Sequence, residues 1–152
     1  MPLAVEDAEV LPPEPARVVA VLDNALPIGR AANAAAVMAL TMGQRHPELV
    51  GAALVDAAGN RHPGLIPIGI AVLGAPAAEL IALRDKARAR GLEVVDFPVQ
   101  GQETTDYAAF RRMVSETAPA DILYLGVMIF GGRKQVGRLV GRYRLLGTAV
   151  EQ

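Results

Sequence analysis

Two polar side chains at the start of an alanine-rich segment could form an anion-binding site. Arg30 and Asn33 follow a β-branched run that ends at Asp23 and Asn24, and the residues after them are mostly alanine. Residues three apart lie on one face of a helix. The first turn of a helix also presents free N–H groups and partial positive charge, which favour phosphate or carboxylate. We therefore predict a ligand-binding set here, made of Asn24, Gly29, Arg30 and Asn33.

The residue types in this set limit the chemistry that it could perform. The guanidinium of Arg30 keeps its proton at physiological pH, so it can hold an anion but cannot serve as a general acid or base. Asp23 could orient Arg30 or hold a water molecule, although Asp at a strand end also forms turns by local hydrogen bonding. Arg30 could equally pair with Asp23 or face solvent. Asp23, Arg30 and Asn33 are thus candidate catalytic residues that have structural alternatives.

The closing segment of the chain is a second candidate site. Its twelve residues from position 133 contain no acid and five cations: Arg133, Lys134, Arg138, Arg142 and Arg144. Three of these cations recur every four residues and would form one stripe of a helix. A basic stripe beside a Gly-Gly turn suits an RNA backbone or a phosphorylated ligand; the alternative is a solvated helix face. The predicted ligand-binding residues here are Gly131, Gly132, Arg133 and Lys134.

The chain has no cysteine and only two histidines, His46 and His62. This composition excludes disulfides, thiolate zinc sites and histidine-rich metal sites, and we predict neither a metal nor a cofactor. His62 could be a general base if Asp56 orients it, but a hairpin loop with an incidental histidine is the simpler interpretation. His46, before Pro47, marks the end of a helix. A cysteine-free chain fits a reducing cytoplasm, where we expect the protein.

Composition divides the chain into a leader and one domain. The 152 residues suffice for a single core, and 52% hydrophobic residues with 20% charged residues are typical of globular proteins. Residues 1–16 contain four acids, no base and several prolines, which predicts a flexible leader before a domain at 17–152. The longest apolar run, residues 65–78, is too short for a membrane span. We interpret it as a buried strand and expect no membrane partner.

Strands and helices alternate along this domain. We expect helices at residues 29–45, 75–91 and 105–117, strands at 17–23, 92–99 and 121–131, and a strand–turn–strand unit at 49–74 with its turn at 58–60. The closing segment should form either a helix alone or a helix followed by a short strand. The alternation predicts an α/β fold, a three-layer sandwich with a mixed, mostly parallel sheet, since the strands are almost continuously apolar. Ligands in such folds bind beyond the carboxyl ends of the strands. The strand ends in question are Asp23-Asn24, Gln100-Gly101 and Gly131-Gly132.

Three stretches resemble the peptidyl-tRNA hydrolase II superfamily over residues 17–147. They are RVVAVLDNALPIGRAANAAAV, which contains the first strand and helix, VVDFPVQGQETTDY in the middle, and MIFGGRKQVGRLVGRYRLL near the end. The chain is most similar to a bacterial branch of that superfamily known only as a domain of unknown function. The resemblance implies the fold of these hydrolases, and it implies tRNA as a possible partner.

The residues that match the hydrolase motif differ from it at several positions. Gly29-Arg30 stands where the hydrolases have Gly-Lys, and Asn33 lies one residue before the position of their glutamine. No histidine is present between Arg30 and His46, and Val140 replaces a threonine. Thr104 stands where the hydrolases have a threonine in the site, so the resemblance makes it a further catalytic candidate.

These observations leave several function hypotheses open. The protein could be a hydrolase of the peptidyl-tRNA hydrolase type, or an RNA-associated protein, with an anion site at the first helix. It could instead be a non-catalytic module that binds a small anionic metabolite, or a structural or regulatory dimer. The missing lysine and histidine favour the non-catalytic hypotheses, whereas the basic closing segment favours the first.

The alanine-rich helix also suggests a partner. Its small side chains allow a close approach to the sheet or to a second subunit. Aromatic residues make up only 4% of the chain, so large core residues are few. We therefore predict a homodimer.

Overall fold

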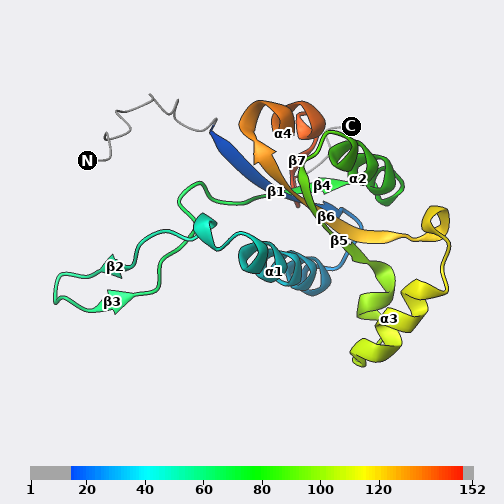
Figure 1. Cartoon of the computed structure of the whole chain (residues 1–152), viewed down its shortest axis with the longest axis horizontal. Helices are drawn as coiled ribbons and strands as arrows, with labels where there is room; N and C mark the ends of the chain where they lie inside the picture. Colours follow the sequence, from blue (N-terminus) through cyan, green and yellow to red (C-terminus); the bar gives the residue numbers. More distant parts are fainter. Residues whose placement is uncertain (1–14, 149–152) are drawn as a thin grey trace, which may run out of the picture.

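Five strands form the main sheet of the computed structural model, which describes residues 15–148 (Figure 1). Their order across the sheet is β5 (Glu93–Pro98), β6 (Tyr124–Gly132), β1 (Ala16–Asp23), β4 (Ala71–Ala75) and β7 (Arg144–Leu145). The predicted leader lies outside the described residues, apart from residues 15 and 16. The sheet is mixed, as expected.

Helices cover both faces of this sheet. On one face lies α1 (Ile28–Arg45), and on the other lie α2 (Leu80–Ala89) and α4 (Arg133–Val140), as Figure 1 shows. Each helix turns residues at i, i+3 and i+4 spacing towards the sheet. The buried ones are Ala31, Ala34, Met38 and Met42 in α1, Leu80, Leu83 and Ala87 in α2, and Val136 and Val140 in α4. Two cores therefore flank the sheet, and the α/β three-layer arrangement is confirmed.

Local sequence signals fix the ends of several elements. Gly91 has a φ of 73° directly after α2, a backbone conformation that glycine adopts without strain. Asp106 caps α3 (Tyr107–Ser115) by accepting hydrogen bonds from the backbone N–H groups of Ala108 and Ala109. The closing segment forms α4 and then the short strand β7, which was one of the two expected forms.

The expectation of a mostly parallel sheet is wrong. In the main sheet of the described residues, only β1 and β4 pair in parallel, whereas the pairs β1–β6, β5–β6 and β4–β7 are antiparallel. A continuous run of apolar residues indicates that both faces of a strand are covered. Parallel and antiparallel strands can both be covered in this way, so the run does not reveal the direction of the strand. Strands β1, β4 and β5 consequently end at one edge of the sheet, which we call the carboxyl edge, while β6 ends at the opposite edge.

The apolar run at residues 65–78 is only partly a buried strand. Its strand β4 covers residues 71–75, and Leu65 and Ile68 are exposed. The chain before it forms a hairpin of two short strands, β2 (Leu54–Val55) and β3 (Arg61–His62), with the expected turn at Gly59. Residues 50–70, which we call the arm, extend away from the sheet in Figure 1.

No helix among residues 15–148 is both long enough and apolar enough to cross a membrane.

Candidate functional site

The turn before α1 lies at the carboxyl edge and uses the side chain of Asp23. Its Oδ1 accepts a hydrogen bond from the backbone N–H of Ala25 at 2.9 Å. Pro27 then precedes the helix, and no side chain caps the helix start. Arg30 is exposed two residues into the helix. The carboxylate of Asp23 therefore shapes the turn, which was the structural alternative for this residue.

A glutamine from the loop after β5 joins Arg30 and Asn33. The short 3-10 helix η3 (Val99–Gln102) follows β5, and Gln102 Nε2 donates to the carbonyl oxygen of Arg30 at 3.0 Å and to Asn33 Oδ1 at 3.2 Å. Gln102 Oε1 is buried and has no hydrogen-bond partner in the described part of the chain. We call Arg30, Asn33 and Gln102 the first-helix cluster. It offers one guanidinium and two amides, and none of these groups can carry a proton between reactants at neutral pH.

Sequence reasoning did not single out Gln102. The strand end at Gln100-Gly101 was expected at the carboxyl edge. It does lie there, because β5 runs in the same direction as β1. Nothing in the local sequence showed that Gln102 would reach α1, since that contact joins residues 69 and 72 positions apart.

Thr104 belongs to the loop that starts α3. Its Oγ1 accepts a hydrogen bond from the backbone N–H of Asp106 at 3.0 Å, next to the capping carboxylate. The hydrogen bonds of the described residues do not connect Thr104 to the first-helix cluster. Its hydroxyl therefore orders the loop before α3.

The second predicted set lies at the other edge of the sheet. Gly131 and Gly132 pair with Arg17 and Ala16 at the beginning of β1, not with the end of that strand. Arg133 and Lys134 open α4 at the same place, where the N–H of Arg133 donates to the carbonyl of Pro15 at 2.7 Å. The antiparallel direction of β6 is the reason, so Gly131, Gly132, Arg133 and Lys134 cannot share one site with Asn24, Gly29 and the first-helix cluster.

Cations from two neighbouring helices, from the residues that follow these helices and from β7 instead gather beside the carboxyl edge. Two adjoining hollows of about 270 and 360 Å³ share the side chains of Glu79, Arg142 and Tyr143. Among residues 15–148, their lining contains a single carboxylate, Glu79, and a set of cations that we call the basic groove: Lys86, Arg90, Arg138, Arg142 and Arg144. The larger hollow also reaches Asn24, a predicted ligand-binding residue at the end of β1.

The positive charge of the basic groove is largely uncompensated. Arg142 Nη2 lies 2.5 Å from Glu79 Oε1, so the lone carboxylate is already paired. Arg142 also donates to the hydroxyl oxygen of Tyr143 at 2.9 Å, and this hydrogen bond raises the pKa of Arg142 above its usual value. Among residues 15–148, no ion pair involves the other four cations of the groove. Such a surface attracts anions and raises their local concentration.

Three of the five cations in the basic groove were singled out in the sequence. Arg138, Arg142 and Arg144 belong to the predicted basic closing segment. Lys86 and Arg90 come from the end of the preceding long helix, where basic residues favour the helix dipole regardless of any ligand. Only the packing of α2 beside α4 shows that these two sets face one groove.

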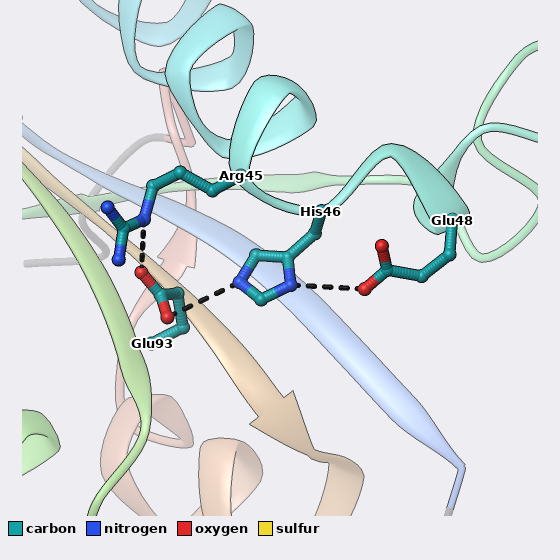
Figure 2. A network of polar contacts seen from close by, with 4 residues as sticks. All are labelled: Arg45, His46, Glu48 and Glu93. Carbon is teal, nitrogen blue, oxygen red and sulfur yellow. Dashed lines mark hydrogen bonds and ion pairs between the residues drawn. The ribbon is translucent and has the colours of Figure 1, made fainter.

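Figure 2 shows a separate polar network at the opposite edge, around His46. His46 Nδ1 lies 3.1 Å from Glu48 Oε1, and Nε2 lies 3.3 Å from Glu93 Oε2 without hydrogen-bond alignment. Arg45 donates from Nε to Glu93 Oε1 at 2.5 Å, which lowers the pKa of the Glu93 carboxyl. The imidazole packs edge-on against Phe130, with ring centroids 4.8 Å apart. These contacts tie the end of α1 to the start of β5.

His62 pairs with Asp56 in the arm. His62 Nε2 lies 2.9 Å from Asp56 Oδ2, and this hydrogen bond is the main cause that lowers the pKa of Asp56 to about 2. Asp56 Oδ1 also accepts from the backbone N–H groups of Ala58 and Asn60, which closes the hairpin turn. The pair was considered as an oriented general base, but it is exposed and its carboxylate holds the turn.

The described residues contain no group of three or more His, Asp or Glu side chains placed to hold a metal ion.

Comparisons with known proteins identify the fold but not an activity. Residues 16–147 match the model of a family described as Protein of unknown function (DUF2000). The solved structures include a protein of unknown function from Agrobacterium tumefaciens that is similar in fold. Its TM-score is 0.78 at 20% sequence identity, and the match covers 86% of this chain and 96% of that one. No curated protein matches the chain.

Proposed function

Because the chain belongs to a family of proteins of unknown function (DUF2000), we propose its function from its own geometry: it binds an anionic, phosphate-bearing ligand without transforming it. The observation that carries the proposal is the basic groove. Five cations from α2 and its C-cap, from α4 and the turn after it, and from β7 line it around one carboxylate of the described residues. Phosphate groups are the common biological ligands with enough charge to neutralise several cations at once.

The lining of the basic groove favours binding over catalysis. It contains no histidine, and Glu79 is held by Arg142. The other charged groups are guanidinium and ammonium donors, which bind phosphate oxygens but remain protonated near neutral pH, and Asn24, Tyr143 and Thr148 add neutral polar groups. Leu83, Leu139 and the ring of Tyr143 add an apolar wall, so the ligand would carry an organic part beside its phosphate.

A charge reversal in the groove tests this proposal. Inorganic tripolyphosphate is titrated into the full chain at low salt in a calorimeter. We expect Arg138→Glu to weaken binding at least ~10-fold, a loss of about 1.4 kcal/mol, because it replaces an attractive charge by a repulsive one. The matched control is Arg111→Glu in α3, an exposed arginine that does not line the groove. Equal losses in both variants, or no binding by the unmodified chain, would contradict the proposal.

The first-helix cluster supports a second candidate function, hydrolysis of peptidyl-tRNA or association with tRNA. This activity follows from the resemblance to the peptidyl-tRNA hydrolase II superfamily, and Gln102 strengthens it by adding a second amide beside Arg30 and Asn33. The candidate is weaker because Asp23 is held in the turn and Arg30 cannot exchange a proton at neutral pH.

A cleavage assay separates the two candidates. We expect the unmodified chain to release no amino acid derivative from peptidyl-tRNA, because the cluster lacks a proton carrier. The assay is run beside Arg30→Ala and beside a known hydrolase as the positive control. Turnover by the unmodified chain that disappears in Arg30→Ala would establish the hydrolase and overturn the non-catalytic proposal.

A further inference from the structure

We propose that the arm and the outer face of α1 together form the interface of a homodimer, in which the partner is a second copy of this chain. This inference is independent of the ligand proposed above. It starts from the arm, whose 21 residues include none that is buried. Five of its apolar side chains, Val50, Leu54, Val55, Leu65 and Ile68, are 50–68% exposed.

The base of the arm packs against the core on the α1 side of the sheet through Ile66 and Ile70. Its hairpin, residues 54–62, is entirely exposed and has no such support. Its two strands pair over only two residues each, and isolated two-stranded hairpins are marginally stable in water. The turn is nevertheless well specified, since Asp56 accepts backbone hydrogen bonds and Gly59 adopts a φ of 85°. Exposed apolar side chains on an ordered projection mark a surface that another molecule covers.

The outer face of α1 adjoins the arm and is also apolar. The surface helix of a soluble protein usually turns charged residues to solvent. Here Ile28, Ala32, Ala36 and Leu40 recur every four residues on the side away from the sheet, and Ile28 and Leu40 are 89% and 78% exposed. The only charged residues in the 18 residues of the helix are Arg30 and Arg45, near its two ends.

The spacing along this stripe points to a copy of itself as the partner. Suppose that two such helices pack antiparallel through their outer faces, with a two-fold axis that crosses the helix at the height of residue 34. Ile28 of each copy then meets Leu40 of the other. Ala32 of each copy then meets Ala36 of the other. The small residues lie at the middle of the contact, where they permit the helix axes to approach within about 8 Å. A two-fold axis requires this kind of self-complementary surface.

The same axis provides a place for the arm. In Figure 1 the first turn of α1 lies towards α3, and its last turn lies towards the arm. Antiparallel packing therefore carries the arm of each copy to the first turn of the partner's α1. Ile28 is exposed there, and Tyr107 at the start of α3 is 74% exposed. The apolar side chains of the arm would cover both.

The size and charge of the combined surface suit a stable dimer. The arm and the outer face of α1 together approach the roughly 20–30 residues that each partner contributes to a standard interface. Asp56 and Arg61 are the only acidic and basic residues of the arm besides its single histidine, so their charges cancel. A surface depleted of charge is typical of interface cores.

Light scattering coupled to size exclusion tests the dimer with the full chain. We expect the unmodified chain to have twice the 16.0 kDa mass of one copy, and Leu40→Glu to have the mass of one copy with an unchanged circular dichroism spectrum. The matched control is Leu123→Glu, which changes another exposed leucine (59%) outside the proposed interface and should remain dimeric. A monomeric unmodified chain, or a dimer that survives Leu40→Glu, would overturn the proposal.

Disulfide trapping tests the antiparallel register. The chain contains no cysteine, so an introduced thiol is the only one present. We expect an oxidised mixture of Ala32→Cys and Ala36→Cys chains to give covalent dimers, and Ala32→Cys alone to give few. Equal trapping in both samples would overturn the antiparallel register.

Discussion

Replacing Gly126 by valine is expected to lower the free energy of unfolding by about 3 kcal/mol, because the core has no space for a side chain there. Gly126 lies in β6 between β1 and β5. A Cβ atom at this position would lie 2.5 Å from Leu22 Cδ2 and 2.9 Å from Met38 Cε, both fully buried. It would also lie 3.1 Å from the carbonyl oxygen of Val21, which side-chain rearrangement cannot relieve.

Thermal and urea unfolding followed by circular dichroism measure this effect. We expect the Tm of Gly126→Val to fall by roughly 10 °C. The matched control is Gly43→Ala in α1, where a Cβ meets no atom within 4 Å. Alanine in a helix interior should raise the unfolding free energy by about 0.5–1 kcal/mol. If Gly126→Val unfolds at the temperature of the unmodified chain, the packing of α1 on β6 differs from the one described.

Gly126 also shows where sequence reasoning stops. The strand at residues 121–131 could be predicted because its apolar run is local, and β6 covers residues 124–132. The need for glycine in the middle of this strand could not be predicted, because the side chain of Met38 that fills the space lies in a helix 88 residues earlier in the chain. The spacing of apolar residues predicts which elements form and which faces they bury. It does not predict which residues contact one another across the core.

The direction of β6 had the largest consequence for the candidate site. Three strand ends were expected at one edge of the sheet, and two of them, Asp23-Asn24 and Gln100-Gly101, do lie there. Gly131-Gly132 lies at the other edge because β6 runs antiparallel to β1. An apolar strand indicates that both of its faces are covered, but it does not indicate the direction of the strand. The sequence therefore could not show that the closing glycines lie at the opposite edge from the first helix.

The exposed arm and the full basic groove could not be predicted from the sequence for a related reason. Leu65 and Ile68 read as a buried strand because apolar residues are usually covered by their own chain, whereas here they are exposed. Lys86 and Arg90 read as helix-end residues because their second role depends on α4 lying alongside. In both cases the local pattern predicted the type of element. Its exposure or its second role depends on neighbours that are distant in the sequence.

Gly64→Ala is expected to convert the dimer into monomers while leaving the sheet folded. A Cβ atom on Gly64 would overlap the carbonyl oxygen of Gly51 and lie 2.8 Å from that of Ala52. These are backbone atoms on the opposite side of the arm's base, so the two chain segments must separate. Their separation would also break the hydrogen bond from the N–H of Gly51 to the carbonyl of Leu65, which measures 2.8 Å.

The effect should fall mainly on the arm, because only Ile66 and Ile70 of the arm pack against the core and neither is fully buried. We therefore expect a near-native circular dichroism spectrum together with the mass of one copy in light scattering. Gly59→Asn is the matched control, since asparagine tolerates the φ of 85° at this turn and should preserve the dimer. A Gly64→Ala chain that remains dimeric with a disordered arm would restrict the interface to α1. Loss of the dimer in Gly64→Ala but not in Gly59→Asn would show that the arm holds the partner through the geometry of its base.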